Sequence, residues 1–357
     1  MRLTGSALLF AGLVAGGPFV SAQALPDGPA FGGSRVFSLG LNPLGNSARF
    51  DQATPGWYLG RVAGDLKSKD QPDALDGLTA LAGADATVHA ATLAKLAANP
   101  WAQRSLGYSI SLAKAGGIHG SLSREEYTGL LASADQDPGH RGSTLALNGT
   151  SMELRRAAVN RLVTGVGSMA EGAAYGFAFR LEEWRFGQQV RALNPGAGQL
   201  PMGDPKTALD FADTQEKRFT ATLDGGVVFE VAPGLRIGGM VDRLLPATYG
   251  DIREQAQVRA GLQLDLGTMA QLSAEADLNE ATRLPFAAKQ KSASVSLRIL
   301  AGPAVQLLVG AERKTLAGVA TSSLGATLFL KAGGFQVGAG LRFGQDRPLL
   351  GLGVKVD

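Results

Sequence analysis

Apolar and polar residues alternate with a period of two along the C-terminal third of the chain. In residues 258–266, Val258, Leu262 and Leu266 share one face, while Arg259 and Asp265 lie on the other. This period is that of a β-strand with one apolar face. The same alternation occurs in residues 272–278, 292–299, 305–312, 324–331, 335–344 and 350–356. Short Gly-containing turns separate these segments, so the pattern predicts an antiparallel meander of hairpins.

The alternation continues upstream of these segments. A hairpin is predicted around Pro233-Gly234, and residues 173–186 predict a long strand with Tyr175 and Phe179 on one face. Earlier strands are predicted at residues 58–66, 106–112 and 118–127. We therefore expect about fourteen strands and no second domain.

Two segments interrupt the β pattern. Residues 72–99 carry apolar residues at helical spacing between Asp73, a favourable N-cap, and Asn99-Pro100, which would end a helix. Residues 194–217 are rich in Pro, Gly and Asp. We therefore expect a short helical insertion at 72–99 and a long loop at 194–217.

Residues 1–22 have the organisation of a secretory signal peptide. Arg2 precedes an apolar run at residues 7–15, Gly16-Gly17-Pro18 breaks it, and small residues permit cleavage after Ala22 or Ala24. The alternative is a buried N-terminal helix of a cytosolic protein. The signal peptide explains both the break and the small residues, so it predicts export.

The composition excludes several kinds of chemistry. The chain has 49 Gly, 3 His and no Cys, so it forms no disulfide, thiolate zinc site or iron–sulfur cluster and has no cysteine nucleophile. His89 and His140 lack metal-ligand spacing, and neither a metal nor another cofactor is expected. With 34 Lys and Arg against 31 Asp and Glu, the small net charge of +3 does not favour nucleic-acid binding.

Strands with one apolar face fit two architectures, a soluble sandwich or a barrel whose apolar face meets lipid. The signal peptide, the strand lengths and the alternation of short hairpins with longer loops favour the barrel. The prediction is therefore an all-β fold, a transmembrane antiparallel β-barrel of about 14 strands at residues 57–357. The 6% aromatic content and the non-aromatic last residue, Asp357, keep a soluble exported β-protein as an alternative.

Gly33, Arg35, Gly40, Asn42 and Pro43 form a short motif at the opening of the expected mature chain. This motif resembles the opening of the FadL, PorV and TraF-type outer-membrane barrels. Short motifs at residues 64–66, 274–278 and 310–313 are similar to segments of the same barrels. The helical insertion after an early strand looks most like the conjugal transfer TraF-like group. The resemblance implies that residues 23–56 fold inward as a hatch.

The resemblance also implies a non-enzymatic role in the outer membrane. In FadL-like transporters the hatch gates a path for a hydrophobic ligand, whereas PorV-like barrels serve in secretion. The expected function is thus passage of a hydrophobic small molecule, or an accessory role in conjugal transfer or secretion. The expected partners are outer-membrane lipid, a hydrophobic ligand or proteins of a transfer or secretion apparatus, without nucleic acid.

The polar faces of the predicted strands would line the lumen of such a barrel. Their charges have both signs, which favours a structural salt-bridge ladder that supports a plug over a charge-selective filter. Glycines on these faces, such as Gly261 and Gly338, would leave space for the plug or a ligand. The charged residues expected in the lumen are Arg259, Asp265, Glu275, Asp277, Arg298, Glu312 and Arg342.

One pair of residues suggests a catalytic alternative. His119 and Ser121 project to the same side of a predicted strand, where an imidazole could activate a hydroxyl. The pair resembles the His-x-Ser of outer-membrane lipid hydrolases, which place it on the outer wall beside their substrate, and Glu125 or Glu126 could orient the imidazole. The simpler interpretation is a polar strand end, so no catalytic residue is assigned.

Overall fold

The computed structural model describes residues 34–37, 46, 48, 56–67, 101–114, 116–133, 151–192, 200–201, 216–249, 252–283, 288–302, 304–316, 319–344 and 349–356. The expected signal peptide, the helical insertion at 72–99 and most of the expected loop at 194–217 lie outside these residues. Within the described ranges, no helix is long and apolar enough to cross a membrane.

Fourteen strands of the described chain form one closed antiparallel barrel, as the alternation predicted. Neighbours in the barrel are neighbours along the chain, and the first strand pairs with the last, with Trp57 opposite Val356. The barrel strands are β1 (Gly56–Lys67), β2 (Trp101–Lys114), β3 (Ile118–Ser133), β4 (Ser151–Ala170), β5 (Ala173–Ala192), β7 (Glu216–Ala232), β8 (Leu235–Asp242), β11 (Gln257–Leu266), β12 (Ala270–Asp277), β14 (Ala288–Leu300), β15 (Val305–Leu316), β16 (Val319–Ala332), β17 (Phe335–Gly344) and β18 (Leu349–Val356).

Four short strands accompany the barrel. β6 (Leu200–Pro201) pairs with the end of β5, and β13 (Ala281–Arg283) extends the pairing of β14. β9 (Thr248–Tyr249) and β10 (Ile252–Arg253) form a small separate hairpin between β8 and β11. These short strands lie outside the closed path.

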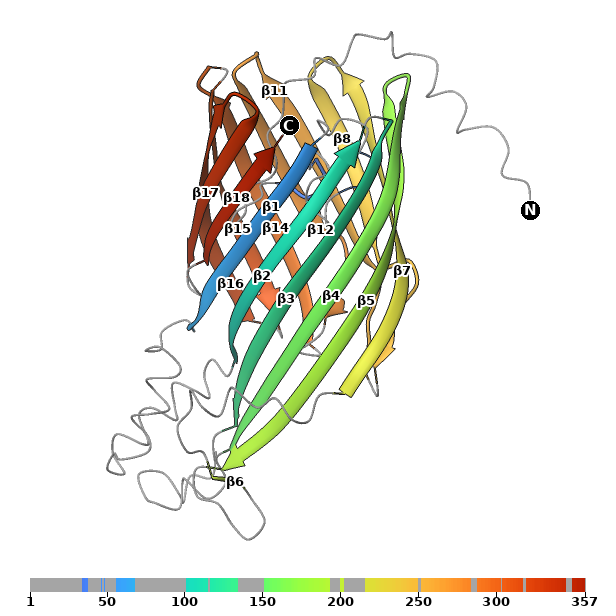
Figure 1. The fold of residues 1–357 in the computed structure, drawn as a ribbon. Coiled ribbons are helices and arrows are strands. Elements are labelled where there is room, and N and C mark those ends of the chain that lie inside the picture. Colours follow the sequence, from blue (N-terminus) through green and yellow to red (C-terminus); the bar gives the residue numbers. More distant parts are fainter. Residues whose placement is uncertain are drawn as a thin grey trace, which may run out of the picture.

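The two ends of the barrel differ. Tight turns join β4 to β5, β7 to β8 and β16 to β17 at one end, which we call the hairpin end and which is uppermost in Figure 1. Gly234 and Gly333 occupy turn positions there with φ of 76° and 58°, a conformation that glycine adopts without strain. At the opposite end, the loop end, residues 68–100 and 134–150 connect successive strands. This asymmetry of short and long connections is typical of outer-membrane barrels.

The alternation separates an outer apolar face from a buried inner face. On β5, Tyr175, Phe177 and Leu181 are exposed, whereas Ala178 and Arg180 between them are buried. The exposed apolar run ends at Glu183, so it covers about 20 Å of strand from Tyr175 at the rise of an extended chain. A band of this height is close to the apolar belt of a membrane barrel, roughly 25 Å.

Several exposed aromatic residues lie near the margins of this belt, whereas Phe177 and Phe179 lie within it. Trp57 and Phe335 are exposed in one register row beside Val356, next to the hairpin end. Phe343 and Phe219 are exposed towards the loop end of their strands. Aromatic side chains at both margins form the girdles of a membrane barrel, so a low aromatic content is compatible with the fold.

Candidate functional site

Part of the N-terminal region packs against the inner wall of the barrel. We call residues 34–37, 46 and 48 the N-terminal segment. The Ser34 hydroxyl donates to the Glu275 carboxylate at 2.5 Å, and the Val36 amide donates to the same oxygen at 2.9 Å. Because Glu275 belongs to β12, one lumen carboxylate binds the N-terminal segment through two hydrogen bonds.

Asn46 folds the N-terminal segment back on itself. Its backbone amide donates to the Arg35 carbonyl at 3.0 Å, and its side-chain amide donates to the Val36 carbonyl at 2.9 Å. The same amide reaches the carbonyls of Val227 on β7 and Gly239 on β8, each at 3.4 Å. Asn46 is completely buried, so its amide joins the segment to two strands of the wall.

Glycines make room for the N-terminal segment on three neighbouring strands. A β-carbon at Gly238 on β8 would lie 2.6 Å from Val36 Cγ1, and one at Gly261 on β11 would lie 3.0 Å from the Phe37 ring. A β-carbon at Gly226 on β7 would collide with the Asn46 side chain. The missing side chains therefore allow the segment to lie directly on the sheet.

An apolar cluster forms where the N-terminal segment meets the wall. Val36, Phe37 and Ala48 are buried against apolar residues of β5, β7 and β8. These wall residues are Ala174, Val228 and Met240. The barrel interior is therefore not uniformly polar, and the cluster offers apolar contacts beside the N-terminal segment.

Arg35 ties the N-terminal segment to a network of buried charges. Its guanidinium binds the Asp242 carboxylate at 2.6 Å, and Asp242 is almost fully buried. Asp242 also lies 3.9 Å from Arg180, which pairs with Asp224 on β7. Of the five motif residues, Arg35 is described, whereas Gly33, Gly40, Asn42 and Pro43 lie outside the described residues.

The network continues around Glu182. This carboxylate binds Arg161 at 2.7 Å and Arg243 at 3.1 Å, and it accepts a hydrogen bond from the Trp184 indole at 2.9 Å. Arg243 also pairs with Glu254 and has a φ of 61°, unusual for a residue with a side chain. Its backbone amide donates to Asp224 at 2.8 Å, so several carboxylates hold this conformation. Buried charges that are paired in this way are costly to disrupt one at a time.

The Trp184 ring is enclosed by side chains of the network. It stacks on Phe186 with a centroid distance of 5.6 Å, and the guanidinium groups of Arg161 and Arg243 lie 5.6 and 5.9 Å from its centroid. Cation–π contacts of this kind strengthen where water is excluded. The loop-end half of this wall is therefore filled by packed side chains.

The expected lumen residues occupy the buried face and pair across strands. Arg259 binds Glu275 and Asp277, Asp265 binds Arg236 at 2.9 Å, and Arg342 binds Glu312 at 2.7 Å. Arg298 is half-buried in register between Gln271 and Leu308. Their role as a ladder that supports a plug stays a prediction. The sequence did not single out Ser34, Asn46, Arg161, Arg180, Glu182, Trp184, Asp224, Asp242 and Arg243.

Glycines on the wall opposite the N-terminal segment have aromatic rings over them. A β-carbon at Gly338 would lie 2.8 Å from the Phe329 ring, and one at Gly353 would lie 2.6 Å from the Tyr58 hydroxyl. Rings that cover strand glycines are a known means of stabilising curved sheets. Here the space beside these glycines is filled by rings of neighbouring strands.

His119 and Ser121 share one face of β3, but this face is the inner one. Both side chains are buried, whereas Ile118 and Leu122 are exposed on the outer face. Glu125 binds Arg161 at 2.6 Å and lies six residues from His119, about 20 Å along an extended strand. The lipid-hydrolase alternative requires the pair beside lipid, and this placement does not support it.

The fold and this occupied interior define a class of protein, the closed antiparallel barrels of fourteen strands that hold an N-terminal segment against their inner wall. The chain is similar to a mutant of TodX described as a monoaromatic hydrocarbon channel, with a TM-score of 0.52 and 12% identity over 92% of this chain and 96% of that chain. It is similar to the toluene transporter TodX of Pseudomonas putida, with a TM-score of 0.51 and 12% identity over 92% and 95% of the two chains. The resemblance to FadL-like barrels is thus confirmed for the fold, and the closeness to TraF-like proteins stays a prediction.

Comparisons of the sequence with protein families and with curated proteins found no match. No protein-family model matches the chain, and no curated protein matches its sequence. In the part of the chain that the structure describes, no group of three or more His, Asp or Glu side chains could hold a metal ion.

Proposed function

We propose that the protein is an outer-membrane β-barrel through which small hydrophobic molecules pass, with residues 23–56 as its hatch. The observation that carries this proposal is the N-terminal segment seated on Gly226, Gly238 and Gly261. There a few hydrogen bonds and an apolar cluster hold the N-terminal segment inside a closed barrel. Such a segment can leave its seat without breaking any strand pairing of the barrel.

The outer face and the fold support the location and the cargo. The exposed apolar belt with aromatic margins suits a bilayer, and the expected signal peptide suits export. The similar structures are described as a toluene transporter and a monoaromatic hydrocarbon channel. Apolar contacts from Phe37, Val228 and Met240 would accommodate such a molecule when the segment moves.

Two further functions carry less support. An accessory role in conjugal transfer or secretion rests on the sequence motifs alone. A lipid hydrolase would need His119 and Ser121 on the outer face, and both are buried inside. We therefore assign the barrel a non-enzymatic role in passage.

Uptake by whole cells tests the proposal. Cells that produce the barrel should take up radiolabelled toluene faster than cells with an empty vector, while uptake of a sugar of similar mass should stay the same. Heat-modifiable migration of the purified outer-membrane fraction checks the location. Equal toluene uptake in both strains contradicts the proposed passage, and recovery of the protein in the soluble supernatant contradicts the location.

A matched pair of variants connects uptake to the interior. Met240→Gln places an amide in the buried apolar cluster, and Met269→Gln makes the same change at an exposed turn. We expect the first variant to slow toluene uptake and the second to leave it unchanged. Equal uptake by both variants would contradict a role for the apolar cluster.

A further inference from the structure

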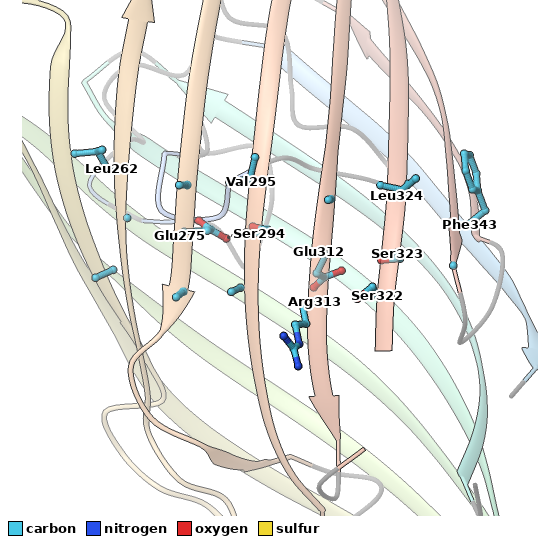
Figure 2. A pocket seen from close by; sticks show the side chains of 17 residues that line it. Leu262, Glu275, Ser294, Val295, Glu312, Arg313, Ser322, Ser323, Leu324 and Phe343 are labelled. Atoms are coloured by element: carbon cyan, nitrogen blue, oxygen red, sulfur yellow. Dashed lines mark hydrogen bonds between the residues drawn. The ribbon is translucent and has the colours of Figure 1, made fainter. Parts of the chain in front are cut away.

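A groove of about 970 Å³ runs across the outer wall of the barrel from β11 to β17. Figure 2 shows Leu262 at one margin, Phe343 at the other and Arg313 at the lower end. Large apolar side chains that are about half exposed surround it, namely Leu262, Val295, Leu324 and Phe343. These large side chains are on the outer face of the barrel, although Glu275 and Gly261, which contact the N-terminal segment, also line the groove.

The strand register explains the groove. Ala260, Ala276 and Ala293 lie side by side on β11, β12 and β14, and all three point outward. In the adjacent row, Ala274 and Ala311 flank Val295. Because these outward side chains are single methyl groups, the wall is thin here and the larger neighbours form its rim.

A single cation ends the row of alanines. Arg313 on β15 is the register partner of Ala293 on one side and of Ser322 on the other. Its side chain is exposed, and within the described residues it makes no hydrogen bond or ion pair. A charge on the outer face of a membrane barrel is unfavourable by about 2 to 4 kcal/mol at mid-bilayer, but by little near the interface.

The position of Arg313 matches the interface. It lies close to the loop end of β15, which finishes at Leu316. The row of Phe343, Leu324 and Ala311 is the next one towards the hairpin end, so Arg313 lies just beyond an aromatic residue of the loop-end margin. Head groups occupy this level of a bilayer, and acyl chains occupy the level of the next row towards the hairpin end, which contains Ala274, Val295 and Ala311.

We propose that this groove binds a phosphate-bearing lipid of the surrounding leaflet, with its phosphate at Arg313 and its acyl chains over the next row of the groove, at Ala274, Val295 and Ala311. An arginine binds phosphate through strong, charge-assisted hydrogen bonds, and the apolar groove beside it fits chains attached to that phosphate. The inference rests on the membrane location proposed above, but not on passage through the lumen.

Native mass spectrometry of the full-length barrel in detergent tests the proposal by lipid titration. The probes are phosphatidylglycerol, diacylglycerol with the same chains, and inorganic phosphate. Arg313→Gln should weaken phosphatidylglycerol binding about tenfold and leave diacylglycerol binding unchanged, because one charge-assisted contact is lost. Arg253→Gln, at an exposed arginine of β10 outside the groove, is the matched control and should change neither.

A second pair of variants tests the acyl-chain part of the groove. Ala276→Phe fills the groove and should weaken binding of both lipids, whereas Ala339→Phe alters an exposed alanine of β17 outside it and should change neither. If Arg313→Gln binds phosphatidylglycerol as tightly as Arg253→Gln does, the proposal is overturned. Tight binding of inorganic phosphate alone also overturns it. A dimer that Ala276→Phe disrupts, with lipid binding unchanged, overturns it as well.

The location is checked separately. If the protein fractionates as a soluble protein, the proposed membrane location fails. If it fractionates with the outer membrane and Arg313→Gln binds phosphatidylglycerol normally, only the lipid site fails.

Discussion

Replacement of Glu275 by Gln should release the N-terminal segment from the barrel wall. One oxygen of Glu275 accepts hydrogen bonds from the Ser34 hydroxyl and the Val36 amide, and the other binds Arg259. Gln has nearly the same shape, but it offers one neutral oxygen and one donor. It therefore cannot accept from both the segment and Arg259.

The expected loss follows from the hydrogen bonds involved. Hydrogen bonds to a charged acceptor contribute about 1.5 to 3 kcal/mol each and neutral ones about 1 kcal/mol. Two bonds to the segment are weakened, so docking should lose about 2 to 3 kcal/mol. This loss raises the undocked population roughly 30- to 150-fold. Arg259 keeps its contact with Asp277, so the barrel itself should remain folded.

The undocked population can be measured through a single cysteine. The chain has no Cys, and Val36 is completely buried when the segment is docked. In a Val36→Cys background, the rate of labelling by a water-soluble maleimide reports how often the segment leaves its seat. We expect Glu275→Gln to raise this rate by the factor given above.

Glu312→Gln is the matched control for the labelling experiment. Glu312 pairs with Arg342 on β17, and within the described residues its side chain makes no hydrogen bond or ion pair with the N-terminal segment. This variant should label at the rate of the Val36→Cys parent. If Glu275→Gln also labels at the parental rate while its barrel stays heat-modifiable, Glu275 does not hold the segment and the reasoning is refuted.

Three further predictions concern the wall, the core and the lumen. Gly238→Ala should increase the labelling rate of the cysteine at position 36, because its β-carbon would crowd that side chain. Gly239→Ala should not, because its β-carbon would have only an ordinary contact. Equal labelling rates in the two variants would contradict the seating of the N-terminal segment on Gly238. Trp184→Ala should lower the free energy of unfolding by about 3 to 5 kcal/mol in urea titrations, because Trp184 is buried. Trp57→Ala, at an exposed position, should lower it by much less. A similar loss in both variants would contradict the buried cluster around Trp184. Planar-bilayer recordings should give small currents without strong ion selectivity, because the described lumen charges are extensively paired. Large currents that are selective for one sign of ion would indicate a charge-selective filter instead.

The sequence was sufficient to predict the barrel because each strand with a clean alternation has one apolar outer face. β4 was missed because its apolar residues lie on both faces. Val159 and Val163 are buried inside, and Leu162 and Val166 are exposed outside. A strand whose faces mix apolar and polar residues has no clear period of two, although β4 pairs with β5 along its full length and with β3 from Ser151 to Val166.

The interior was predictable only in part. Glu275 and Arg259 belong to strands with clear polar faces, so their position followed from the alternation. Arg180 and Glu182 share the inner face of β5 with Ala178, and a mixed face of this kind gives no signal. Asn46 was missed for another reason, because its role depends on contacts with β7 and β8, about 180 residues away along the chain.

Uptake through a barrel with a reversible cross-link tests the central claim most directly. A β-carbon at Gly238 would lie close to Val36, so Val36→Cys with Gly238→Cys should form a disulfide, and the chain has no other cysteine. If the N-terminal segment is a movable hatch, toluene uptake should fall when this cysteine pair is oxidised and recover when it is reduced. Toluene uptake by each single-cysteine variant should not change with the oxidant. Uptake that is the same in the oxidised and reduced states would contradict the account.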